Sequence, residues 1–133
     1  MKKFYENKFM AVHYDETLNL VIEQWKDYQN LKLTKESYQE GAQGLLTAIE
    51  ANKATKWLAV LTELKVLSIE NQHWFAEHIF PKAIKAGITQ IAVLNAKDIF
   101  GLVATKNILR KMGTGITLEN FDSYDKAIQW LRL

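Results

Sequence analysis

The sequence contains no cysteine, and this absence removes several kinds of chemistry at once. Disulfides, thiolate metal sites and cysteine nucleophiles all need a sulfur atom that this chain does not provide. A secreted fold held together by disulfides is therefore not expected, and we predict a cytoplasmic protein. Proline is scarce as well: the one residue is Pro81, and no proline-rich linker divides the chain.

Long apolar runs and a strong net charge are also missing. No run of about eighteen apolar residues occurs, so the sequence predicts no transmembrane segment. The N-terminus begins with two lysines, but polar residues from Glu6 to Lys8 interrupt it before the apolar core of an export signal can form. The 17 Lys and Arg against 15 Asp and Glu give a net charge of +2. Because these charges are interspersed, nucleic acid is not a predicted partner.

The glycine motifs of nucleotide-binding and hydrolase folds are absent. There is no G-x-S-x-G turn, no phosphate loop and no G-x-G-x-x-G fingerprint. The segment Gly113-Thr114-Gly115 stands before an expected strand, which is the reverse of the strand-to-helix order that nucleotide loops need. These absences favour a non-enzymatic protein without a cofactor.

One cluster has the look of a metal site. An inverted zinc-protease motif reads H-x-x-E-H, and this chain has His73, Glu77 and His78 but carries Trp74 where the first histidine is needed. On a helix, His78 would point about 100° away from Glu77, so the three side chains would not share one face. We therefore predict no metal site and interpret the cluster as a surface ion pair or a contact for a partner.

What the chain does have is the composition of a single globular domain over residues 1–133, with 48% hydrophobic residues. A chain of this length buries roughly two thirds of its unfolded surface. Apolar alternation predicts strands over Lys8 to Tyr14 and Leu18 to Trp25. The short polar connection Asp15-Glu16-Thr17 favours an antiparallel hairpin between them.

Helices and strands then alternate. Thr34 is a predicted N-cap for a helix in which Gly41 and Gly44 indicate close packing on the sheet or, alternatively, a ligand near the backbone. Apolar runs predict strands over Trp57 to Leu61 and Ile88 to Leu94. Between these strands we expect a helix from Ser68 to Gly87.

Pro81 falls inside that helix and removes a hydrogen bond, so the helix should kink there or restart with Pro81 in its first turn. A third helix is expected to begin at Asn95 and to end at Met112-Gly113. A strand over Ile116 to Phe121 and a terminal helix capped by Asp122 or Ser123 complete the chain.

This order predicts an α/β fold with a mixed, mostly parallel five-stranded sheet, an N-terminal hairpin and about four helices. If the last three strands are parallel, the segments that follow them share one edge of the sheet: Thr62 to Ser68, Asn95 to Asp98 and Asp122 to Asp125. Helix N-termini at such an edge attract anions. The candidate regulatory, phosphorylation or anion site is therefore Ser68, Lys65, Asn95 and Lys97.

Three segments carry a resemblance to a known family: WLAVLTELKVLSIENQHW (57–74), FPKAIKAGITQIAVL (80–94) and DSYDKAIQWL (122–131). Their sequence and order resemble the small bacterial proteins described as SpoIIAA-like or STAS/SEC14-like. The resemblance implies a non-enzymatic module that binds proteins, switched in some members by phosphorylation of a serine at the start of a helix. Ser68 holds the matching position. The regulatory Asp-Ser-Ser/Thr-Gly motif is absent there, and Ser68 also fits a plain helix cap.

A SEC14-like resemblance further implies an apolar pocket. Its walls in this chain would be Trp57, Trp74, Phe75 and Phe80, although the same side chains would serve equally well as core. Two functional hypotheses follow. The first is a regulatory module that binds a protein partner or associates with itself, as a homodimer for example. The alternative is a carrier or sensor of a small apolar or lipid ligand.

Overall fold

The structure, a computed structural model, describes residues 1–28, 31–64, 67–94, 110 and 115–133. Within these residues the chain forms one six-stranded sheet whose strands lie side by side in the order of the sequence. The strands are β1 (Lys2–Glu6), β2 (Met10–Asp15), β3 (Leu20–Trp25), β4 (Lys56–Val60), β5 (Gln90–Leu94) and β6 (Thr117–Phe121).

The direction of pairing changes once along the sheet. β1 with β2 and β2 with β3 pair antiparallel, whereas β3 with β4, β4 with β5 and β5 with β6 pair parallel. The predicted hairpin, formed by β2 and β3, is therefore confirmed, as is the mixed, mostly parallel α/β sheet.

The sheet has one strand more than the five predicted. The additional strand, β1, lies at the edge, and three of its five residues are exposed. Its apolar residues Phe4 and Tyr5 are consecutive, and its register with β2 shifts between Lys3 and Tyr5. An edge strand with a bulge has no alternating apolar pattern, so the sequence signal for it is weak.

α1 (Lys35–Asn52) begins where predicted. The Thr34 side chain accepts a hydrogen bond from the N–H of Ser37 at 3.1 Å, as expected of an N-cap. The helix lies close to the sheet at Gly44, where an added Cβ would be 2.7 Å from the Tyr5 ring. Close packing on the sheet is therefore the confirmed interpretation of this glycine.

The helix after β4 is interrupted as its proline predicts. α2 (Ile69–Trp74) continues into a π-helical turn, η1 (Phe75–Ile79), and then into α3 (Phe80–Lys85). Pro81 stands in the first turn of α3, where the missing N–H costs no helical hydrogen bond. The predicted restart is thus confirmed. Gly87, with a φ of 124°, follows the end of this helix.

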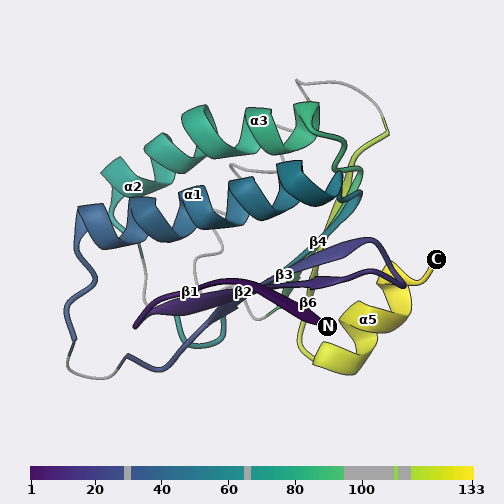
Figure 1. Cartoon of the computed structure of the whole chain (residues 1–133), viewed down its shortest axis with the longest axis horizontal. Coiled ribbons are helices and arrows are strands. Elements are labelled where there is room, and N and C mark those ends of the chain that lie inside the picture. The colour runs from purple at the N-terminus through teal and green to yellow at the C-terminus, as the bar shows by residue number, and fades with distance from the viewer. Residues whose placement is uncertain (29–30, 65–66, 95–109, 111–114) are drawn as a thin grey trace.

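Helices cover both faces of the sheet (Figure 1). α1, α2 and α3 lie over one face, and α5 (Tyr124–Leu131), capped by Ser123, lies over the other. The alternating side chains of β4 divide accordingly, since Trp57 faces the larger core and Leu58 the smaller one. The helix predicted from Asn95 to Met112-Gly113 lies outside the described residues except for Arg110, which is helical.

Candidate functional site

The carboxyl ends of the parallel strands meet at one edge of the sheet, as the sequence indicated. Val60, Leu94 and Phe121 are aligned in register at the ends of β4, β5 and β6. The helix caps Ser68 and Ser123 follow two of these ends. The other candidate anion-site residues, Lys65, Asn95 and Lys97, lie outside the described residues.

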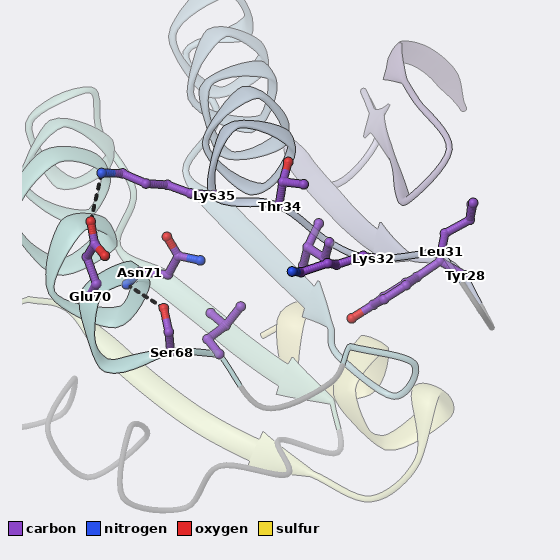
Figure 2. A pocket seen from close by; sticks show the side chains of 10 residues that line it. Tyr28, Leu31, Lys32, Thr34, Lys35, Ser68, Glu70 and Asn71 are labelled. Carbon is purple, nitrogen blue, oxygen red and sulfur yellow. Dashed lines mark hydrogen bonds and ion pairs between the residues drawn. The ribbon is translucent and has the colours of Figure 1, made fainter.

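A groove opens at this edge, between the beginnings of α1 and α2 (Figure 2). Its volume is about 500 Å³, and we name it the Ser68 groove. Ten residues line it: Tyr28, Leu31, Lys32, Leu33, Thr34, Lys35, Leu67, Ser68, Glu70 and Asn71. They come from two segments, one that follows β3 and one that follows β4. Because these strands are parallel neighbours, both segments emerge at the same edge.

The segment 28–35 is the half of the site that the sequence prediction missed. The sequence predicts that the last three strands are parallel, but β3 also runs parallel to β4, and this puts the start of α1 beside Ser68. The signal was present in the order strand, helix, strand over 18–61, which is the pattern of a parallel crossover.

Ser68 caps α2. Its Oγ accepts a hydrogen bond from the N–H of Asn71 at 3.1 Å, while the Leu67 carbonyl accepts one from the Gln72 side chain at 2.9 Å. Ser68 is an exposed residue, and it lies in the wall of the groove. The capping role is thus in place, and a regulatory role for Ser68 stays a prediction.

The charged side chains of the groove have an excess of positive charge. Lys35 on α1 and Glu70 on α2 form an ion pair at 2.7 Å, and this hydrogen bond raises the pKa of Lys35 above its ordinary value. Lys32, which is exposed, is a second cation in the groove wall. In Figure 2 the Lys32 amine points into the groove toward Asn71. The two cations against one carboxylate favour an anionic ligand.

Asn71 is the unusual residue of the groove, because it is only 8% exposed. Its Oδ1 is buried and has no hydrogen-bond partner in the part of the chain that the structure describes. An acceptor left in this state costs roughly 1–3 kcal/mol of folding free energy. Sequence pattern alone gives no sign of it, since Asn71 sits near a helix start where polar residues are common.

Three of the four predicted pocket aromatics, Trp57, Phe75 and Phe80, pack against one another, and none of the four lines the Ser68 groove. The ring centroids of Trp57 and Phe80 lie 5.5 Å apart, and those of Phe75 and Phe80 lie 5.6 Å apart. Trp74 meets the Tyr38 ring at 6.2 Å. A ligand between these rings would have to separate them, and an apolar pocket here stays a prediction.

Beneath these rings lies a buried carboxyl group that the sequence analysis did not single out. Glu23 accepts hydrogen bonds from the indole N–H of Trp25 at 2.7 Å and from that of Trp57 at 3.0 Å. Burial raises the pKa of Glu23, and the two indole bonds oppose this effect. The sequence signal for this buried carboxyl group was an acidic residue, Glu23, in an apolar strand two positions before Trp25.

The family model described as SpoIIAA-like matches residues 29–132. The chain belongs to the SpoIIAA-like family. The match begins after the N-terminal strands, so the Ser68 groove of this SpoIIAA-like domain lies within it except for Tyr28. The resemblance stated from the sequence is thereby confirmed. Such a domain is in general a regulatory or protein-binding module.

A solved structure extends the likeness in fold to nearly the whole chain. The NMR structure of the protein TM1081 superposes with a TM-score of 0.57 over 96% of this chain and 92% of that one. The two sequences are 12% identical, so the likeness is one of fold. Among curated proteins no relative matches.

The histidine cluster of this SpoIIAA-like domain is exposed. His73, Glu77 and His78 lie at the surface of α2 and η1, and the His78 ring is 5.9 Å from the Trp74 ring. Within the described ranges no three His, Asp or Glu side chains are grouped closely enough to hold a metal ion. Nor does any helix in those ranges have the length and apolar character to cross a membrane.

Proposed function

We propose that this SpoIIAA-like domain is a non-enzymatic, regulatory protein-binding module of the cytoplasm, and that a partner protein docks at the Ser68 groove. The family supports the protein-binding class, and the position of exposed apolar side chains supports the place. Leu31, in the groove wall, is 46% exposed, and Ile69, between two groove residues, is 73% exposed. Leaving both in water is unfavourable, so covering them would favour association.

The other exposed large hydrophobic side chains of the described residues belong to neither of the two segments that form the groove. They are Met1, Tyr124 and Leu133, and two of these are the chain ends. The Ser68 groove therefore combines a concave surface, the exposed side chain of Leu31 and a serine that a kinase could reach, and the exposed Ile69 lies next to that serine in the sequence. Phosphorylation of Ser68 would place a dianion in the groove and alter docking, which is the regulation we propose.

Crosslinking from defined positions tests this proposal. A photo-reactive amino acid in place of Ile69 should give an adduct of defined mass in host cells, whereas the same amino acid in place of the exposed Gln129 on α5 should not. The partner found in this way is then purified, and Ile69→Lys should weaken its binding about tenfold or more. Equal crosslinking at both positions, or unchanged affinity of Ile69→Lys, would refute the proposal.

The same adduct distinguishes the kinds of partner. An adduct of twice the chain mass would identify self-association as a homodimer, and another mass would identify a second protein. Native mass spectrometry of the purified chain completes the comparison. A retained small apolar molecule would support the alternative function, a lipid or apolar-ligand carrier, whose ligand would separate the rings of Trp57, Phe75 and Phe80.

A further inference from the structure

We propose that the Ser68 groove binds a small oxyanion that carries its own hydrogen-bond donor. Hydrogen phosphate and the α-hydroxy carboxylates are the simplest members of this class. The inference goes beyond the proposed function, because it requires no protein partner. It rests on the charges at one end of the groove and on the unpaired acceptor of Asn71.

The first requirement, negative charge, follows from the start of α1. This helix has 18 residues, and its first N–H groups have no partner inside the helix. Thr34 Oγ1 accepts the N–H of Ser37, which leaves the earlier N–H groups available to a ligand. Lys35 belongs to the same turn, and Lys32 precedes it. A helix start with two lysines attracts an oxyanion.

Two carboxylates oppose this attraction, Glu36 in the first turn of α1 and Glu70 in the groove wall. Glu70 is held by Lys35 in an ion pair whose side chains are 53% and 67% exposed. Exposed ion pairs contribute little, so an arriving anion can share Lys35 without a large loss. The Lys32 amine, which points into the groove, makes no ion pair with any described residue and needs no such exchange.

The second requirement, a donor on the ligand, follows from Asn71. Its Oδ1 is a buried acceptor on a residue of the groove wall, and it lacks a donor among the described residues. Figure 2 shows the Asn71 side chain extending from α2 toward the start of α1, between the Lys35–Glu70 pair and Lys32. An anion that can only accept hydrogen bonds would face this oxygen with like partial charge. An anion with an O–H group would satisfy it.

Pairs of anions that differ in the donor test the inference directly. Hydrogen phosphate has a P–OH group at neutral pH and sulfate has none; lactate has a hydroxyl group that propionate lacks. Each anion is titrated into the full chain at constant ionic strength, and the amide NMR signals of Lys35, Glu36 and Asn71 are followed. We expect the donor-bearing member of at least one pair to bind about tenfold more tightly than its counterpart, equivalent to about 1.4 kcal/mol. The responding pair shows whether phosphoryl or hydroxy acid chemistry is recognised.

Variants separate the two requirements. Asn71→Leu should remove the preference within the pair, Lys32→Gln should weaken both members, and Lys126→Gln at the start of α5 is the matched control that should change neither. Equal binding of donor-bearing and donor-free anions by the unaltered chain would overturn the inference. So would signal changes centred on α5, or no binding by any of the four anions. The comparison on the unaltered chain decides even if a variant fails to fold.

Discussion

Two opposing effects act on the pKa of the Glu23 carboxyl group. Loss of water disfavours the charged form, while the indole N–H groups of Trp25 and Trp57 favour it. Burial is the larger effect, so the pKa of Glu23 in the folded chain lies above its ordinary value of 4.5. The folded state therefore retains this proton over a pH range in which the unfolded chain has released it.

Stability should consequently depend on pH through Glu23. Its contribution is fully present below the unfolded pKa and is lost as pH rises through the folded pKa, because folding then requires a buried charge. Glu23→Gln cannot titrate, and it leaves one indole N–H without an acceptor, at a cost of about 1–3 kcal/mol. We expect this cost to be greatest in mild acid and to shrink as pH rises. Denaturant unfolding of both chains across this range measures it.

Because every other titrating group is shared by the two chains, the difference between their stabilities isolates Glu23. Two profiles that stay parallel from acid to neutral pH would contradict the assignment of a raised pKa. Direct carboxyl NMR titration of the unaltered chain is an independent control, and it should place the Glu23 transition above 4.5.

Ser68 makes a separate prediction at the residue scale. Since its Oγ accepts the N–H of Asn71, Ser68→Ala should destabilise the chain by about 1 kcal/mol, and Ser68→Asp, which can still cap, should not. Thr34→Ala is the matched control, because Thr34 caps α1 in the same way. Thermal or denaturant unfolding gives the comparison. If Ser68→Ala costs nothing while Thr34→Ala does, the role of Ser68 is not capping.

At the scale of elements, α1 and β1 are in close contact at Gly44. A Cβ at this position would lie 2.7 to 2.9 Å from three atoms of the Tyr5 ring. Alanine favours a helix by about 1 kcal/mol over glycine, yet we expect Gly44→Ala to destabilise the chain by about 1–3 kcal/mol because the ring must move. Denaturant unfolding measures the change, with Gln43→Ala at the exposed neighbouring position as the control.

A double-mutant cycle with Tyr5→Ala isolates the contact. Once the ring is gone, Gly44→Ala should stabilise rather than destabilise, so the two substitutions should be strongly non-additive. Additive effects would mean that the cost of Gly44→Ala arises elsewhere in α1.

Local sequence signals predicted most of the elements for physical reasons that the structure makes plain. Thr34 and Ser68 cap the turn that directly follows them, and Pro81 acts through its own missing N–H. Their effects can therefore be predicted from neighbouring residues in the sequence. β1 was not predicted, because an edge strand is specified by its partner β2 more than by its own apolar pattern.

Only half of the site could be predicted from the sequence, because the other half depends on contacts between residues far apart in the chain. The edge of the sheet near Ser68 followed from strand order, but the Lys35–Glu70 pair joins residues of different helices, and no local pattern encodes it. The unpaired Oδ1 of Asn71 is harder still to predict from the sequence. It exists only because tertiary packing buries that residue, and periodicity cannot distinguish it from an ordinary polar residue of the first turn.

In the molecule as a whole, two cores share one sheet. The larger core contains Trp25 and Trp57 beneath α1, and the smaller contains Leu58 of β4 and Leu131 of α5. Successive residues of β4 belong to opposite cores, so neither core can lose its packing without disturbing the strand that both use. This arrangement predicts a single cooperative unfolding transition.

A cavity in the smaller core should therefore be felt in the larger one. Leu131 is fully buried against the sheet, and Leu131→Ala should cost about 2–5 kcal/mol, with the exposed Arg132→Ala as the neutral neighbour. Tryptophan fluorescence is weighted toward the larger core, which holds Trp25 and Trp57, whereas far-UV circular dichroism reports the helices on both faces. The two probes should shift together to lower denaturant concentration. If fluorescence kept its original midpoint while circular dichroism showed an early loss, α5 would be unfolding alone, and the shared sheet would not couple the cores.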